Sequence, residues 1–131
     1  MKKRIVSLLL LALMVTTLVV TPICAALNWT VVDDCRITLS FSGTTARCRL
    51  DVYASDSDAD ITATIKLQKK GLLGIYTTKE KWEDVTATGT LNFYDTYSPV
   101  DSGEYRLTAE IDVVGSGGSD SISQAATATK Q

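Results

Sequence analysis

The chain has 131 residues, of which 45% are hydrophobic and 21% are charged, and its net charge is −2. It contains no histidine, which excludes catalysis by Ser-His or Cys-His pairs and removes the usual ligand of catalytic zinc sites. The small acidic excess argues against nucleic-acid binding, because proteins that bind nucleic acid carry a basic patch or stripe.

The N-terminal end has the three-part layout of a secretory signal peptide. Three basic residues (2–4) precede an uncharged apolar run (5–20), and a short run of small residues ends at Ala26. We expect cleavage after Ala26, with Ala25 as the second choice. The secreted protein would then comprise residues 27–131.

Two other interpretations of this segment stay open. An uncleaved membrane anchor would need about 20 apolar residues in a row, whereas the run here is shorter and is closed by Pro22. A bacterial lipoprotein would be acylated at Cys24, but the bulky Ile23 stands where a small residue usually precedes such a cysteine. We favour a cleaved signal over both.

Removal of the signal makes the protein more acidic. It takes away three basic residues and no acidic one, so ten basic residues face fifteen acidic ones and the net charge becomes −5. An acidic surface argues against tight docking to anionic lipid. The sequence ends at Lys130-Gln131 with neither a hydrophobic tail nor a sorting motif. We therefore expect a soluble extracellular protein that has no membrane contact once the signal is removed.

The pattern of the secreted chain is that of one all-β domain. Short runs of alternating apolar and polar residues are separated by clusters of Gly, Ser, Asp and Pro, and no helical periodicity is present. We expect a seven-stranded antiparallel sandwich with an immunoglobulin-like, Greek-key order of strands. The predicted strands cover residues 31–41, 45–54, 61–69, 75–82, 86–93, 104–114 and 121–129.

The first two predicted strands carry the two cysteines of the secreted chain. Cys35 and Cys48 each belong to the apolar set of an alternating run, and the turn Ser42-Gly43-Thr44 joins the two runs. Both side chains should therefore face the core of a hairpin. Because an even pair of cysteines in an exported protein indicates a disulfide, we predict a Cys35–Cys48 bridge with a structural role.

Three carboxylates alternate in the loop before the third predicted strand. Asp56, Asp58 and Asp60 of "DSDAD" resemble the first half of an oxygen-ligand calcium loop. Ile61 stands where such a loop needs its glycine, so any calcium would require ligands from a neighbouring loop. The alternative, which we favour, is a solvated loop that binds no cofactor.

An apolar pair lies at the tip of the next predicted hairpin. In "KKGLLGIY", Leu72 and Leu73 follow two lysines and precede the next strand. Exposed apolar residues at a loop tip can mark a partner contact. The alternative, which we favour, is that the two leucines fold back over the open end of the sandwich.

The stretch "SPVDSGEYRL" joins a polar turn to a strand through a tyrosine. Asp101, Gly103 and Tyr105 form a D-x-G-x-Y pattern that resembles the corner of immunoglobulin-like domains. There the tyrosine ring is buried and its hydroxyl bonds back to the backbone a few residues upstream. Two features depart from antibody domains, because Leu107 replaces the usual cysteine and the third predicted strand carries no tryptophan.

The whole pattern is also similar to a group of small uncharacterised secreted β-sandwich proteins of Gram-positive bacteria. The segments "KEKW", "ATGTLNF" and "SGEYRL" carry this resemblance. It implies a fold and an extracellular location, and it implies no activity.

The sequence offers no set of catalytic residues. It has no histidine, and "GLLG" lacks the lysine of a phosphate-binding loop. We expect a non-catalytic binding or structural module of the extracellular or cell-envelope space, whose partner would be a protein or an envelope polymer. The alternative is a small secreted effector, such as a toxin, a bacteriocin-like factor or a hydrolase inhibitor.

Overall fold

The computed structural model describes residues 29–131. The predicted signal, its cleavage site and Cys24 lie outside the described residues. Within the described part, no helix combines the length and the hydrophobicity that a membrane span requires.

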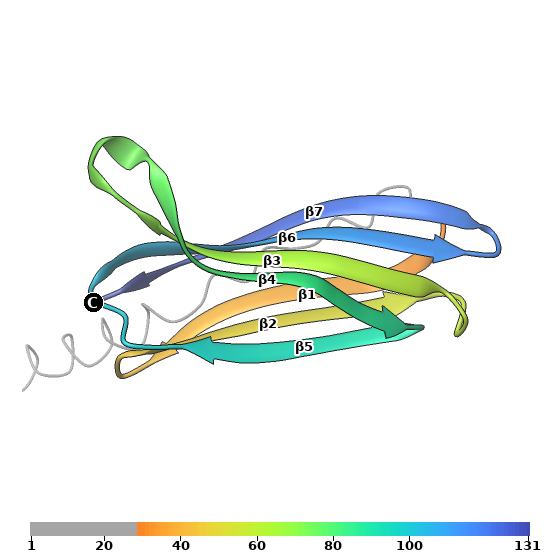
Figure 1. Cartoon of the computed structure of the whole chain (residues 1–131), viewed down its shortest axis with the longest axis horizontal. Helices are drawn as coiled ribbons and strands as arrows, with labels where there is room; N and C mark the ends of the chain where they lie inside the picture. The colour runs from red at the N-terminus through yellow and green to blue at the C-terminus, as the bar shows by residue number, and fades with distance from the viewer. Residues whose placement is uncertain (1–28) are drawn as a thin grey trace, which may run out of the picture.

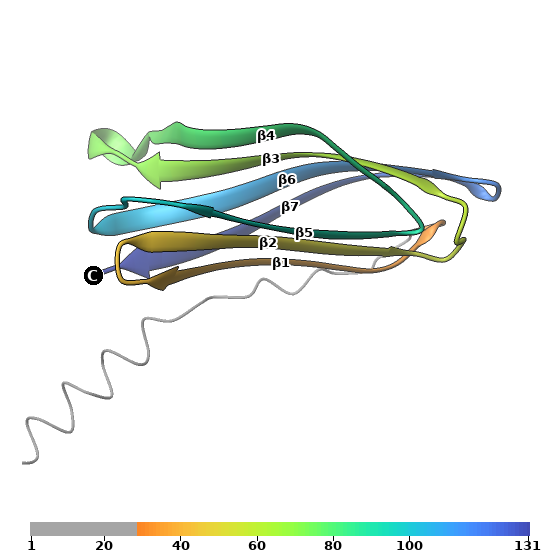
Figure 2. The ribbon, with the colours of Figure 1, turned by 60° about the horizontal axis from the view of Figure 1, so that its bottom comes forward.

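The described chain is all-β and forms two antiparallel sheets (Figures 1 and 2). One sheet has three strands in the order β1-β2-β5, and the other has four in the order β4-β3-β6-β7. A short 3-10 helix, η1, lies at the tip of the β3–β4 hairpin. The elements are β1 (Val32–Ser42), β2 (Thr45–Ala54), β3 (Asp60–Lys70), η1 (Leu72–Gly74), β4 (Tyr76–Thr88), β5 (Thr90–Tyr97), β6 (Gly103–Gly115) and β7 (Gly118–Lys130).

The core lies between the two sheets and follows from the alternation in the sequence. Along most of β1, β2, β3 and β6, every second residue is apolar and buried between the two sheets. Ile37, Leu50, Ile65 and Leu107 are among the fully buried side chains, and each contributes about 1.5–3 kcal/mol through burial. Among the described residues, the buried hydrophobic side chains lie between Val31 and Ala128.

Five of the predicted strands agree with the structure to within three residues at each end, whereas the predicted strand 75–82 ends six residues too early. The predicted strand 86–93 is wrong: β4 runs on to Thr88, and β5 occupies 90–97. The two predicted strands leave residues 83–85 as a connection, but β4 continues through Glu83 and Asp84, which form a bulge opposite the register shift between Ala63 and Ile65. The chain turns instead at Gly89, which has a φ of +77° and where a Cβ would lie 2.7 Å from a backbone oxygen.

The predicted disulfide is not formed. Both cysteines face the core and are fully buried, but Cys35 lies opposite Val52 and Cys48 lies opposite Leu39. Four residues along a strand span about 13 Å, whereas the Cα atoms of a disulfide lie within about 7 Å. The alternation predicted the correct face for each cysteine, and the register of the hairpin separates them. Burial raises the pKa of the Cys48 thiol to about 12, which makes it a poor nucleophile.

Candidate functional site

One end of the sandwich gathers the predicted tyrosine corner, the β3–β4 hairpin and a pocket. Tyr105 begins the buried part of β6, and only 1% of its surface is exposed. Its hydroxyl lies 3.0 Å from the backbone oxygen of Asp101 and 2.7 Å from its Oδ1. Phe41 packs edge-on against the same ring, at 5.4 Å between centroids. The ring therefore holds the segment before β6 against β1.

Lys69 of β3 closes this corner from outside. Its Nζ lies 2.8 Å from Asp101 Oδ1 and 5.8 Å from the centroid of the Tyr105 ring. Gly103 makes room for it, because a Cβ there would lie 2.8 Å from Lys69 Cε and the φ of +144° disfavours other residues. The hydrogen bonds from Lys69 and Tyr105 lower the pKa of Asp101 to about 2. Burial, followed by the bond to Asp101, raises the pKa of Tyr105 to about 12.

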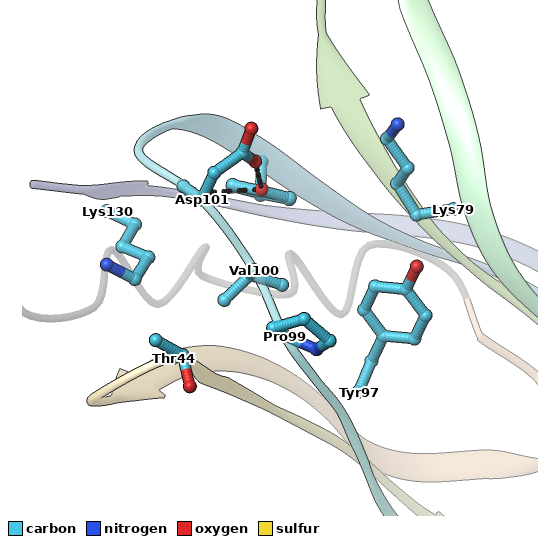
Figure 3. A pocket seen from close by; sticks show the side chains of 8 residues that line it. Thr44, Lys79, Tyr97, Pro99, Val100, Asp101 and Lys130 are labelled. Carbon is cyan, nitrogen blue, oxygen red and sulfur yellow. Dashed lines mark hydrogen bonds between the residues drawn. The ribbon is translucent and has the colours of Figure 1, made fainter.

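A pocket of about 620 Å³ opens beside the corner (Figure 3). Pro99 and Val100 form its floor, and Lys79 and Lys130 stand on opposite sides of it. The backbone N–H of Val100 donates to Thr44 O at 2.8 Å, which fixes this connection between the two sheets. The pocket therefore offers an apolar floor between two cationic groups.

The tip of the β3–β4 hairpin projects from this end of the molecule (Figure 1). Leu72 is 94% exposed, Leu73 is 96% exposed and Ile75 is 65% exposed. The expectation that the leucines fold back over the sandwich is therefore wrong. The 3-10 turn η1 and two hydrogen bonds, from Gly71 N to Ile75 O and from Gly74 N to Gly71 O, hold the tip in its own conformation. The side chains of Leu72 and Leu73 contact mainly solvent.

The base of the hairpin is tied to β6 by polar contacts. Tyr76 donates its hydroxyl to Glu104 Oε2 at 2.8 Å, and Lys70 Nζ lies 3.3 Å from the same oxygen. The guanidinium of Arg106 stacks over the Tyr76 ring at 3.9 Å and donates to Gln68 Oε1. Hydrogen bonds from Tyr76 and Lys70 lower the pKa of Glu104. These contacts make the hairpin an extension of the sheet up to Tyr76.

The basic residues of the protein are concentrated in this hairpin. Residues 66–81 contain five lysines and one glutamate, whereas the rest of 29–131 contains five basic and fourteen acidic residues. A second pocket, of about 450 Å³, lies at the hairpin base and is lined by Lys69, Lys70, Lys79 and Leu72 among others. Lys79 lines both pockets and makes no ion pair with any described residue. The lysines of "KKGLLGIY" and "KEKW" were not predicted to form one basic segment, although a count over sixteen residues reveals it.

The three carboxylates of "DSDAD" lie at the opposite end of the sandwich and do not converge. Asp56 accepts from Asp58 N at 2.9 Å and from the Ser116 hydroxyl at 3.0 Å, and these hydrogen bonds lower its pKa. Nowhere in the described residues do three or more Cys, Asp or Glu side chains gather so that they could hold a metal ion. The oxygens of Asp56 instead link the β2–β3 and β6–β7 loops, so the three carboxylates are not arranged as a calcium loop in this structure.

Two further contacts were not predicted. Trp82 Nε1 donates to Asp95 Oδ2 at 2.7 Å, and the indole packs edge-on against Phe93 at 5.3 Å, so that β4 is joined to β5 across the open edge. Asp120 of β7 accepts from the backbone N–H of Thr30 and Val31 at 2.7–3.0 Å. Both depend on pairs far apart in the sequence, and local patterns do not reveal them.

Comparisons with known proteins identify no family for this chain. No protein-family model matches it, and no curated protein matches it. Among solved structures it is similar to β-glucosidase 3B from Thermotoga neapolitana, in complex with glycerol, at 14% sequence identity and a TM-score of 0.37. The similarity covers 79% of this chain and spans 17% of the length of that enzyme.

Proposed function

We propose that this protein is a secreted, non-catalytic binding module of the extracellular or cell-envelope space, and that the tip of its β3–β4 hairpin is the contact surface. In this proposal the signal is cleaved after Ala26 and the released domain has an immunoglobulin-like, Greek-key fold.

The order of strands supports an immunoglobulin-like assignment. If β1, β2 and β5 are strands A, B and E and β3, β6 and β7 are strands C, F and G, the first three and the last three pair as they do in constant-type domains. The hydroxyl of Tyr105 bonds back to Asp101, as in a tyrosine corner. The position of β4 differs from that in constant-type domains. There the fourth strand joins the sheet that corresponds to β1-β2-β5, whereas β4 pairs with β3.

The exposure of the hairpin tip is the observation that carries the binding proposal. Two adjacent leucines with more than nine-tenths of their surface exposed leave apolar area in water that burial would stabilise by about 1.5–3 kcal/mol per side chain. Single exposed leucines are common, but contiguous apolar groups on a projecting loop mark interaction sites. The absence of histidine from the sequence favours binding over catalysis.

Affinity capture tests this function. The protein of residues 27–131 is immobilised and exposed to envelope and culture-medium fractions of the producing cells. A double variant, Leu72→Ser with Leu73→Ser, should lose the captured material. The matched control, Tyr94→Ser with Val114→Ser, removes exposed apolar side chains elsewhere and should retain it. Equal capture by both variants, or none by the unchanged protein, contradicts the proposal.

A further inference from the structure

We propose that the partner of the hairpin is an anionic lipid bilayer, with the tip inserted among the acyl chains and the lysines at the level of the headgroups. This inference rests on the proposed function and specifies its partner. It reverses the expectation from net charge that the secreted protein does not contact membranes.

The tip has the composition of a membrane-inserting loop. Leu72, Leu73 and Ile75 are all more than half exposed, and no charged residue lies between Lys70 and Lys79. The tip is also raised from the sheets, so the body of the sandwich does not obstruct a flat surface from reaching it (Figure 1). Apolar groups presented in this way gain free energy when they enter the interfacial region of a bilayer.

Leu73 is held in a backbone conformation that leucine disfavours. Its φ is +69° and its ψ is 11°, which is the left-handed region where glycine and asparagine are common. Its side chain is 96% exposed and therefore contributes almost nothing to the core. A strained apolar residue that folding does not require points to a role for the side chain outside the folded chain.

Charge complementarity selects the partner. Residues 66–81 at the outer part of the hairpin carry five lysines and one glutamate. The charged residues that contact it are Glu83, Asp101, Glu104 and Arg106, and with them the net charge is still +2. The remainder of the described chain is acidic, so the tip is the part of the surface that an anionic surface attracts. Each lysine near such a surface contributes favourably to binding.

The pocket at the hairpin base has the chemistry of a headgroup site. Lys69, Lys70 and Lys79 line it together with the backbone of Gly71, and Leu72 continues it toward the tip. If the phosphate of an anionic lipid bound beside the lysines, the acyl chains of that lipid would lie next to the leucines. Lys79 is the cation with the greatest freedom to bind it, since Lys69 and Lys70 are paired with Asp101 and Glu104.

Vesicle flotation tests the inference. The protein of residues 27–131 is mixed with vesicles of phosphatidylcholine alone or with added phosphatidylglycerol. It should float with the anionic vesicles, and high salt should weaken the binding. Leu72→Ser with Leu73→Ser should reduce the partition coefficient at least about tenfold. Lys79→Glu should reduce it about tenfold, whereas Arg47→Glu, the same change on an exposed residue of β2, should have less effect. Circular dichroism checks that each variant is folded.

Insertion of the tip is measured separately. Leu73→Cys places an accessible thiol at the tip, whereas Cys35 and Cys48 are fully buried. An environment-sensitive dye at position 73 should shift to shorter wavelength with anionic vesicles and should be quenched by brominated lipid.

Two results overturn the lipid inference: no flotation with anionic vesicles, or flotation that the Leu72/Leu73 double variant leaves unchanged. If flotation fails while tip-dependent capture of a protein or polymer succeeds, the bilayer is the wrong partner and the binding function stands. If both fail, the proposed function is also wrong.

Discussion

At the scale of single residues, Tyr105 combines a buried ring with a hydroxyl whose partner lies near the surface. The ring fills the core below the pocket, and Asp101 accepts the hydrogen bond. The hydroxyl and the ring therefore contribute separately, and a substitution can remove one and keep the other.

We expect Tyr105→Phe to lower the free energy of unfolding by about 1 kcal/mol, the usual net contribution of one hydrogen bond. For a domain of this size such a loss lowers Tm by about 4–8 °C. Tyr94→Phe is the matched control, because Tyr94 is 60% exposed and lies outside the core. Thermal unfolding of both variants gives the comparison, and equal melting temperatures would contradict the role of the corner.

The same hydroxyl predicts a loss of stability at alkaline pH. An unfolded tyrosine has a pKa of about 10, and the folded pKa of Tyr105 is raised to about 12. The folded state therefore keeps its proton over a range in which the unfolded state loses it, so this contribution is complete below pH 10 and disappears as the pH rises toward 12. Denaturant unfolding between these values should show a smaller decline for Tyr105→Phe than for the unchanged protein.

At the scale of elements, the β3–β4 hairpin keeps its strand pairing, with two register shifts, as far as Lys70 and Tyr76, and it is strained at its tip. Leu73 has a positive φ, and Leu72 does not. The two neighbours are almost equally exposed, so substitution of each by glycine tests the backbone alone.

We expect Leu73→Gly to raise the free energy of unfolding by about 0.5–1 kcal/mol. A left-handed conformation costs a residue with a Cβ about 1–2 kcal/mol, and glycine avoids this cost. Glycine also loses more conformational entropy on folding, which offsets about 0.5–1 kcal/mol of the gain. Leu72→Gly should lower the stability instead. Chemical denaturation measures both, and a loss for Leu73→Gly would contradict the assignment of strain.

The position and inward face of a strand could be predicted from the sequence, whereas the pairing register and the path of a hairpin could not. Alternation located β2 to the residue and gave the inward face of Cys35 and Cys48, because burial repeats every second residue. It could not give the hairpin register that keeps the cysteines apart, nor the bulge at Asp84. For the site, the sequence singled out Leu72 and Leu73 but favoured their folding back over the sandwich, because their exposure depends on the path of the hairpin relative to the sheets.

At the scale of the whole molecule, the start of the described chain is fastened to the last strand. Asp120 accepts from the backbone N–H of Thr30 and Val31, which lie just before β1. The contact joins the two sheets at the end away from the hairpin. The contact therefore links the first and last strands of the described chain.

We expect Asp120→Ala to lower the free energy of unfolding by about 1–2 kcal/mol, because two backbone donors lose a charged acceptor. Asp112→Ala is the control, since Asp112 accepts a hydrogen bond from the exposed side chain of Ser121 on β7, and its loss should change stability by about 0.5 kcal/mol or less. Hydrogen exchange at Val31 should accelerate in the first variant and not in the second. Unchanged exchange there would contradict the contact.

The separation of charge along the sandwich orients the molecule before its tip touches a charged surface. The end away from the hairpin carries a group of carboxylates, at Asp33, Asp34, Asp56, Asp58, Asp60, Asp112 and Asp120. With the lysines at the other end, the molecule has a permanent electric dipole along its long axis (Figure 1). Within about a Debye length of a negative surface, roughly 8 Å in physiological salt, the field would exert a torque on this dipole and turn the leucine tip forward.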